Sequence, residues 1–355
     1  MNIDMWKAQI ESGTVEEKRE AIRAAKDFPI EQVVDTLIKL LYEDNKAIQE
    51  AVIEFLMDCS DDIVVERLLP LLKEEDANVR NAAIEILEKI GRDKVDIIGR
   101  YLDDEDKDVR LFVCDIIGKF GTEKALDYLI KALNDPEVNV RNSAVMGIGK
   151  VQSNRAVEAL SDLLSREEDT WVRFSVIDSL THINLPLAKK VLRDALYQEK
   201  NELVLKALLD AIAKFGGEDF VYDAMYVFEF LMTRKLSDIY SDIVDLGLRV
   251  DKIEDEKLVY KFAVYLCAYI KYAEDRWTAY RAVNVLPKLS CCAEKILLDV
   301  LSFVQEPMIV ASAIEGLGQV GTSESIPVLE RFLSSEDERQ RELAQEAIDK
   351  INSRK

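Results

Sequence analysis

The chain has 355 residues, 48% of them hydrophobic and 32% charged, and its formal net charge is −21. Such an apolar content excludes an intrinsically disordered chain, so the sequence predicts a folded protein with an acidic surface. The acidic surface disfavours nucleic acids, whose binding proteins present basic patches to the phosphates, and favours protein or peptide partners of basic character.

One sequence pattern returns several times along the chain. EEDANVRNAAIEILEKIG at 74–91 is followed by DEDKDVRLFVCDIIGKFG at 104–121, and related stretches occupy 135–151 and 167–183. Each stretch contains a Val-Arg pair, and successive arginines are 30, 31 and 32 residues apart. A fixed period of about 20–50 residues is the signature of a repeat array. The arginines are Arg80, Arg110, Arg141 and Arg173.

Each repeat is expected to form two helices. In the interval 122–151, Leu126 and Leu129 fall on the apolar stripe of a first helix. Pro136 then suits the first turn of a second helix, because the N–H that proline lacks has no partner there. Gly91 and Gly121 each follow a second helix, where a residue with positive φ commonly ends the helix.

The whole chain divides into eleven such units. The first and last are rich in charge, as end caps should be when one face meets water. We predict one continuous solenoid, with regular repeats over 1–216, divergent aromatic-rich repeats over 217–290 and regular repeats over 291–355. The predicted units are 4–27, 30–58, 61–91, 92–121, 122–151, 152–183, 184–216, 219–251, 255–290, 293–321 and 322–353.

The acidic turn, the Val-Arg pair and the Ala-rich helix together resemble the HEAT repeat, especially the phycobilisome-lyase (PBS-lyase) HEAT-like variety. The resemblance covers nearly the whole chain and implies an all-α, right-handed superhelix of about eleven helix pairs. It also implies that the turn acids and the arginines form a structural ladder linking successive units; the alternative is an anion-binding row of arginines. The implied pairs are Asp76 with Arg80, Asp106 with Arg110, Asp135 with Arg141, Asp169 with Arg173, and Asp337 with Arg341.

The repeat pattern changes between 217 and 290, where the Val-Arg signature is absent and eight of the twelve tyrosines lie. In the segment 258–280, one stripe of apolar residues points inward and a second stripe consists of tyrosines. A helix with two apolar faces either fills a wider core or contacts a partner, and both alternatives are open. For a contact surface the candidates are Tyr265, Tyr269, Tyr272, Trp277 and Tyr280, with Arg276 and Arg281 beside them to pair with an acidic group on the ligand.

Residues suited to catalysis are scarce in this sequence. Its single histidine, His182, falls at the end of a second helix, where the helix dipole favours a cation. The five cysteines show no metal-ligand spacing, and no phosphate-binding glycine motif follows a strand. We therefore predict a protein without catalytic residues, metal or cofactor.

Two further features indicate the location of the protein. No run of 18 apolar residues is present, so no membrane segment is expected, and the first residues lack the order of a signal peptide. The odd number of cysteines in so large a chain favours a reducing compartment. The sequence thus predicts a cytoplasmic protein.

These observations lead to one main hypothesis and two alternatives. Repeats throughout the chain predict a noncatalytic scaffold or adaptor that binds a protein or peptide along the solenoid surface. The family resemblance also allows a phycobilin lyase or lyase chaperone, which would stack a tetrapyrrole on the aromatic segment. A HEAT-like nucleic-acid-binding protein is the third possibility, and the acidic composition disfavours it.

Overall fold

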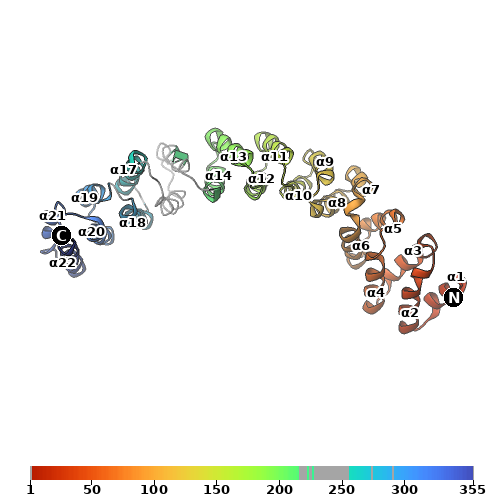
Figure 1. Ribbon diagram of the computed structural model, residues 1–355. Helices are drawn as coiled ribbons and strands as arrows, with labels where there is room; N and C mark the ends of the chain where they lie inside the picture. The colour runs from red at the N-terminus through yellow and green to blue at the C-terminus, as the bar shows by residue number, and fades with distance from the viewer. Residues whose placement is uncertain are drawn as a thin grey trace. The chain divides into compact units, whose positions relative to one another are not determined.

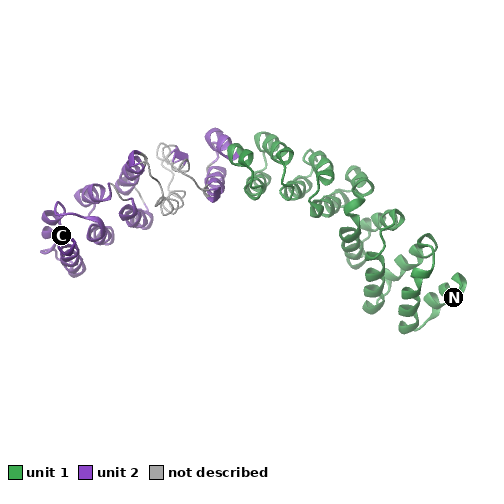
Figure 2. Ribbon diagram, viewed as in Figure 1, with its two compact units in different colours: residues 1–191 green, residues 192–355 purple. Residues whose placement is uncertain are grey.

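The computed structural model describes residues 2–215, 222–223, 226–227, 256–272, 275–289 and 292–354. Within these ranges the regular structure is helical and contains no strand, which confirms the predicted all-α solenoid class (Figure 1). The helices fall in pairs within the predicted units, and the unit 219–251 lies almost entirely outside the described residues. The chain forms two compact units, residues 1–191 and 192–355 (Figure 2). The division at 216 and 290 stays a prediction.

In the first compact unit, each second helix packs against the second helix of the next repeat, from α2 through α4, α6, α8 and α10 to α12. Some first helices end in a 3₁₀ turn, so α5 continues as η3 and α7 as η5. The helices are α1 Ile3–Ser12, α2 Val15–Ala24, η1 Ala25–Asp27, α3 Ile30–Lys39, η2 Leu40–Tyr42, α4 Lys46–Met57, α5 Asp62–Leu68, η3 Leu69–Lys73, α6 Ala77–Ile90, η4 Gly91–Asp93, α7 Val95–Ile98, η5 Gly99–Asp103, α8 Lys107–Phe120, α9 Glu123–Ala132, α10 Val138–Ile148, α11 Asn154–Arg166 and α12 Thr170–His182.

The second compact unit shows the same packing among its described helices. The second helix α18 contacts α20, and α20 contacts α22, while the first helix α17 contacts α19. The boundary between the two units falls within α13. The helices are α13 Pro186–Gln198, α14 Glu202–Phe215, α17 Glu256–Tyr272, α18 Arg276–Val285, η6 Leu286–Lys288, α19 Ala293–Phe303, α20 Pro307–Val320, α21 Ile326–Phe332 and α22 Glu338–Ser353.

Helix α6 illustrates why these sequences form amphipathic helices. The carboxylate of Asp76 accepts the N–H of Asn78 and so caps the start of the helix. Val79, Ala83 and Ile86 follow at helical spacing and are fully buried. Burying such a stripe against the helices on either side contributes about 25 cal/mol per Å² of apolar surface. A single repeat therefore depends on its neighbours to cover its apolar faces.

Two glycines end second helices in different ways. Gly121, after α8, has φ of 59°, the left-handed conformation that glycine adopts without a Cβ penalty, as predicted. Gly91 has φ of −80°, so the predicted positive φ is wrong there. Space is tight at 91 instead, because an added Cβ would lie 2.5 Å from Cδ1 of Ile98, and that side chain would have to move.

Candidate functional site

Arg110 joins two neighbouring repeats through a buried ion pair. From α8 it donates Nε and Nη2 to the two carboxylate oxygens of Asp135, at 2.7 and 3.0 Å. Asp135 lies in the turn between α9 and α10, one repeat further along the chain. The two side chains are only 12% and 8% exposed, so water screens the pair poorly. A planar guanidinium matches a carboxylate in this bidentate way, whereas a lysine ammonium does not.

Arg141 repeats this arrangement one repeat later. It donates from Nε and Nη2 to Glu167, at 2.8 and 2.9 Å. Its Nη1 donates to two carbonyl oxygens of its own interhelical turn, those of Asp135 at 3.0 Å and Pro136 at 3.2 Å. The guanidinium therefore ties two successive turns together and supplies donors to turn carbonyls.

The structure corrects the acidic partners that the family resemblance implied. Asp135 pairs with Arg110 of the preceding repeat, and Arg141 pairs with Glu167 of the following one. The other turn acids accept backbone N–H groups at the start of their own second helices. The first N–H groups of a helix lack partners, and an acid at the capping position reaches them directly. These capping acids are Asp76, Asp106, Asp169 and Asp337.

Arg80, Arg110, Arg141 and Arg341 each donate to a carbonyl oxygen of their own turn. Arg80 and Arg341 donate from Nη1 to the carbonyl oxygen six residues before them, at 2.6 and 2.7 Å. The guanidinium of Arg80 also lies 5.6 Å from the ring centre of Phe112 on α8, a cation–π contact with the next repeat. Arg173 occupies the equivalent position on α12. We propose a structural role for the whole series.

The ion pair between Arg141 and Glu167 predicts a specific dependence of the stability on pH. The hydrogen bond from Arg141 holds the pKa of Glu167 below its ordinary value of 4.5. A carboxyl pKa that is lowered in the folded state stabilises the fold above its ordinary value, and this contribution disappears as the pH falls through the folded-state pKa. We therefore expect Glu167→Gln to be less stable than the wild type near neutral pH, and this stability difference to shrink under acid.

Urea unfolding followed by circular dichroism, from about pH 7 to about pH 3, measures this difference. Glu123→Gln is the control, because the carboxylate of Glu123 is half exposed and its ion pair with Arg155 is screened by water. It should behave as the wild type throughout. A stability difference for Glu167→Gln that stays constant across this pH range would contradict the lowered pKa.

The structure divides the aromatic candidates on α17 between the core and the surface. Tyr269 is 2% exposed and packs in the core with the inward stripe, so its predicted contact role is wrong: a buried ring offers no surface to a partner. Tyr265 is half-buried. Tyr272 is exposed at the end of the helix, with the ammonium of Lys271 5.6 Å from its ring centre. Of these tyrosines, Tyr272 remains a full surface candidate.

The candidates on α18 form a surface cluster. Trp277 stacks on Tyr280 with ring centroids 5.3 Å apart and planes inclined by 25°, and Trp277 is the more exposed of the two. Arg276 pairs with Glu306 at 3.2 Å, so it already has an acidic partner within the protein. Arg281 is half-buried on the same helix. The stacked pair thus offers a rigid aromatic surface beside an ion pair that joins α18 to the start of α20.

Sequence reasoning named Trp277 but missed that it shares one position of the repeat with three other exposed apolar side chains. Each lies two residues after the cap residue of a second helix, at the position called N2. We call them the N2 row. The signal was present in the repeat alignment, since the same column holds polar residues in earlier repeats, such as Asn78 and Asp108. The N2 row consists of Trp171, Leu203, Trp277 and Met308, which are 77%, 60%, 58% and 43% exposed.

Neither a metal-ligand cluster nor a membrane-spanning helix occurs among the described residues. In that part of the chain, no group of three or more His, Cys, Asp or Glu side chains could hold a metal ion. His182 ends α12 and is exposed, with Nδ1 2.8 Å from the carbonyl oxygen of Asp178. None of the described helices has the length and apolar character needed to cross a membrane.

Comparison with solved structures identifies the fold. The crystal structure of Kap121p matches with a TM-score of 0.55 and 13% identity, covering 98% of this chain and 45% of that one. Importin-beta (Kap95p) from yeast matches with a TM-score of 0.46 and 13% identity, covering 99% of this chain and 57% of that one. This chain thus spans about half the length of these two proteins. At this identity the likeness to Kap121p shows an α-solenoid fold alone.

Sequence comparison identifies the family. No protein of curated function matches the chain significantly. The model of the family described as HEAT repeats matches residues 3–88, 65–144, 95–181 and 127–213, and that described as PBS lyase HEAT-like repeat matches 309–335. The first set of matches covers more than half of the chain. The chain therefore belongs to the HEAT-repeat family.

Proposed function

We propose that this protein is a noncatalytic scaffold that binds a protein or peptide of basic character, and that the N2 residues of the second compact unit, Leu203, Trp277 and Met308, are part of the contact surface. The observation that carries the proposal is the recurrence of a large exposed apolar side chain at one repeat position. A single exposed apolar residue needs no explanation, whereas several at one structural position favour a protein contact. Trp and Tyr dominate such contacts because they supply rigid area with little loss of entropy.

The surroundings of Trp277 and Met308 support a shared contact patch. The helices that carry them, α18 and α20, pack against each other. The ion pair between Arg276 and Glu306 joins the same ends of these helices. Tyr280 extends the patch along α18 by stacking on the indole. We define Trp277, Tyr280 and Met308 as the α18–α20 patch.

The charge of the chain supports a basic partner. The net charge is −21, and three of the four N2 residues follow an acidic cap residue, Asp169, Asp275 or Glu306. A suitable partner has apolar side chains between its lysines or arginines. It would bury the apolar side chains against the N2 residues, and the negative potential of this chain would attract its cations. Its capture should therefore weaken as the salt concentration rises.

Affinity capture with quantitative mass spectrometry tests this proposal. The variant Trp277→Ala/Met308→Ala should keep the helical circular dichroism of the wild type, because exposed substitutions change stability by about 0.5 kcal/mol. It should lose at least one basic protein that the wild type captures, by about tenfold. The control is Tyr260→Ala, which removes an exposed ring from the first helix α17. A folded double variant that retains every captured protein would refute the contact role of the patch.

A further inference from the structure

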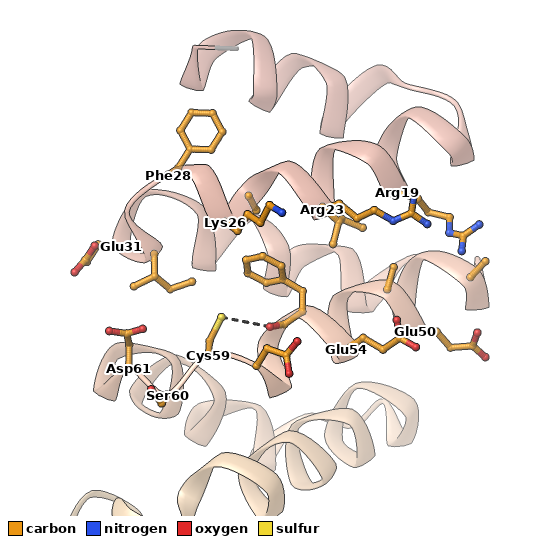
Figure 3. A pocket seen from close by; sticks show the side chains of 17 residues that line it. Arg19, Arg23, Lys26, Phe28, Glu31, Glu50, Glu54, Cys59, Ser60 and Asp61 are labelled. Atoms are coloured by element: carbon orange, nitrogen blue, oxygen red, sulfur yellow. Dashed lines mark hydrogen bonds between the residues drawn. The ribbon is translucent and has the colours of Figure 1, made fainter.

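A groove of about 930 Å³ lies between the second helices of the first two repeats, α2 and α4. Figure 3 shows the side chains that line it. Ile22 from α2 and Ala51 and Phe55 from α4 contribute its apolar lining. The N2 row lies on other helices, so this groove is a separate surface.

The two walls of the groove carry opposite charges. The basic row lies along α2 and just beyond its C-terminal end, at spacings of four and three residues, and consists of Arg19, Arg23 and Lys26. The acidic row lies along α4 and ends at its C-cap residue, at spacings of four residues, and consists of Glu50, Glu54 and Asp58. Figure 3 shows the basic side chains along one helix and Glu50 and Glu54 along the one below. In each row the side chains share one face of a helix.

The two charged rows are not joined by ion pairs. Residues 4–58 are described throughout, and in this stretch no ion pair joins the rows across the groove. Arg19 pairs with Glu16 on its own helix, at 3.4 Å. Arg23, Lys26 and the three acids make no ion pair within this stretch and are available to charges on a ligand. Such electrostatic complementarity gives a binding site its specificity.

Helices α2 and α4 contact each other directly, so the groove is open along the line where their surfaces meet. A peptide bound there lies along the two helices, between the two charged rows.

The spacing of the charges matches an extended chain. Residues four apart on a helix are separated by about 6 Å along its axis. Side chains on one side of an extended peptide recur every second residue, at about 6.7 Å. Successive side chains point to opposite sides, so one set faces the basic wall and the other faces the acidic wall. Long side chains absorb the small difference in spacing.

We propose that the α2–α4 groove binds an extended peptide segment in which acidic and basic side chains alternate. The acidic side chains pair with Arg19, Arg23 and Lys26, and the basic ones pair with Glu50, Glu54 and Asp58. A segment with its charges in two blocks has the same composition but places like charges against each wall. The order of charges, rather than the net charge, is therefore what the groove recognises.

Fluorescence anisotropy with two labelled synthetic peptides of about eight residues tests the proposal. One alternates Glu and Lys, and the other has the same residues in two blocks. With the full-length protein, the alternating peptide should bind about tenfold tighter, since each of several half-exposed pairs adds a modest term. Equal binding of the two peptides would overturn the proposal, as would tighter binding of an all-Lys peptide.

Two variants link the binding to the groove. Glu50→Gln/Glu54→Gln/Asp58→Asn keeps the side-chain sizes and should abolish the preference for the alternating peptide. Arg19→Glu/Arg23→Glu/Lys26→Glu should transfer the preference to the all-Lys peptide. The control variant is Lys7→Glu/Arg92→Glu/Lys107→Glu, which reverses three exposed charges outside the groove. It should leave the preference for the alternating peptide unchanged. A preference that survives in both groove variants would refute the site, and the α18–α20 patch would be unaffected.

Discussion

Replacing Arg110 with alanine is expected to lower the free energy of unfolding by about 3–5 kcal/mol. The substitution leaves the carboxylate of Asp135 buried without its cation, and that side chain is only 8% exposed. It also removes the Nη1 donor from the carbonyl oxygens of Asp104 and Glu105. Arg110→Lys should restore part of the loss, because one ammonium cannot serve the carboxylate and the turn together. Urea unfolding followed by circular dichroism measures the change.

The matched control is Arg155→Ala. Arg155 also contacts two acids, Glu123 at 3.2 Å and Asp127 at 2.6 Å, but all three side chains are more than half exposed. Water screens these pairs, so the loss should stay within about 1 kcal/mol. Equal losses for Arg110→Ala and Arg155→Ala would show that burial does not set the strength of these pairs.

Trp6→Ala is expected to cost about 3–5 kcal/mol, as large aromatic deletions from a core do. The indole of Trp6 is completely buried between α1 and α2, and its Nε1 donates to the carbonyl oxygen of Ala21 at 2.7 Å. The substitution therefore opens a cavity and leaves that carbonyl without its donor. Because the loss falls on the first repeat, hydrogen exchange in α1 and α2 should accelerate most.

Two further variants separate the causes of this loss. Trp6→Phe keeps most of the ring volume and removes the N–H donor, so it should cost about 1–2 kcal/mol. Met5→Ala, next to it on the exposed side of α1, should change stability by about 0.5 kcal/mol or less. A loss in Met5→Ala as large as that in Trp6→Ala would contradict the assignment of Trp6 to the core.

The repeat period made the helix pairs predictable, because a helix that must bury one stripe against its neighbours shows a regular apolar pattern. The arginine positions were equally visible. Their partners were not, because an arginine and a carboxylate in the same short stretch look like a pair in sequence. Lys18 and Glu43, 2.5 Å apart across the first two repeats, follow the same register as Arg110 and Asp135. Only the stacked turns show which acid faces which guanidinium.

The binding surfaces were predictable in part, and for a similar reason. The tyrosine stripe indicated a second apolar face in the segment 258–280, but sequence spacing cannot tell whether a neighbouring helix covers that face. The structure buries Tyr269 and exposes Trp277. The α2–α4 groove gave no sequence signal, because its two charged rows come from different repeats. Each row alone resembles the solvated side of an amphipathic helix.

We infer that Arg110 and Arg141 hold neighbouring repeats together, because each of them pairs with an acid in the following interhelical turn. A double-mutant cycle tests it most directly, combining Arg110→Ala with Asp135→Ala in one cycle and with Asp106→Ala in another. The claim predicts a coupling free energy of about 2–3 kcal/mol for Arg110 with Asp135 and close to zero for Arg110 with Asp106. Strong coupling with Asp106 and none with Asp135 would contradict it.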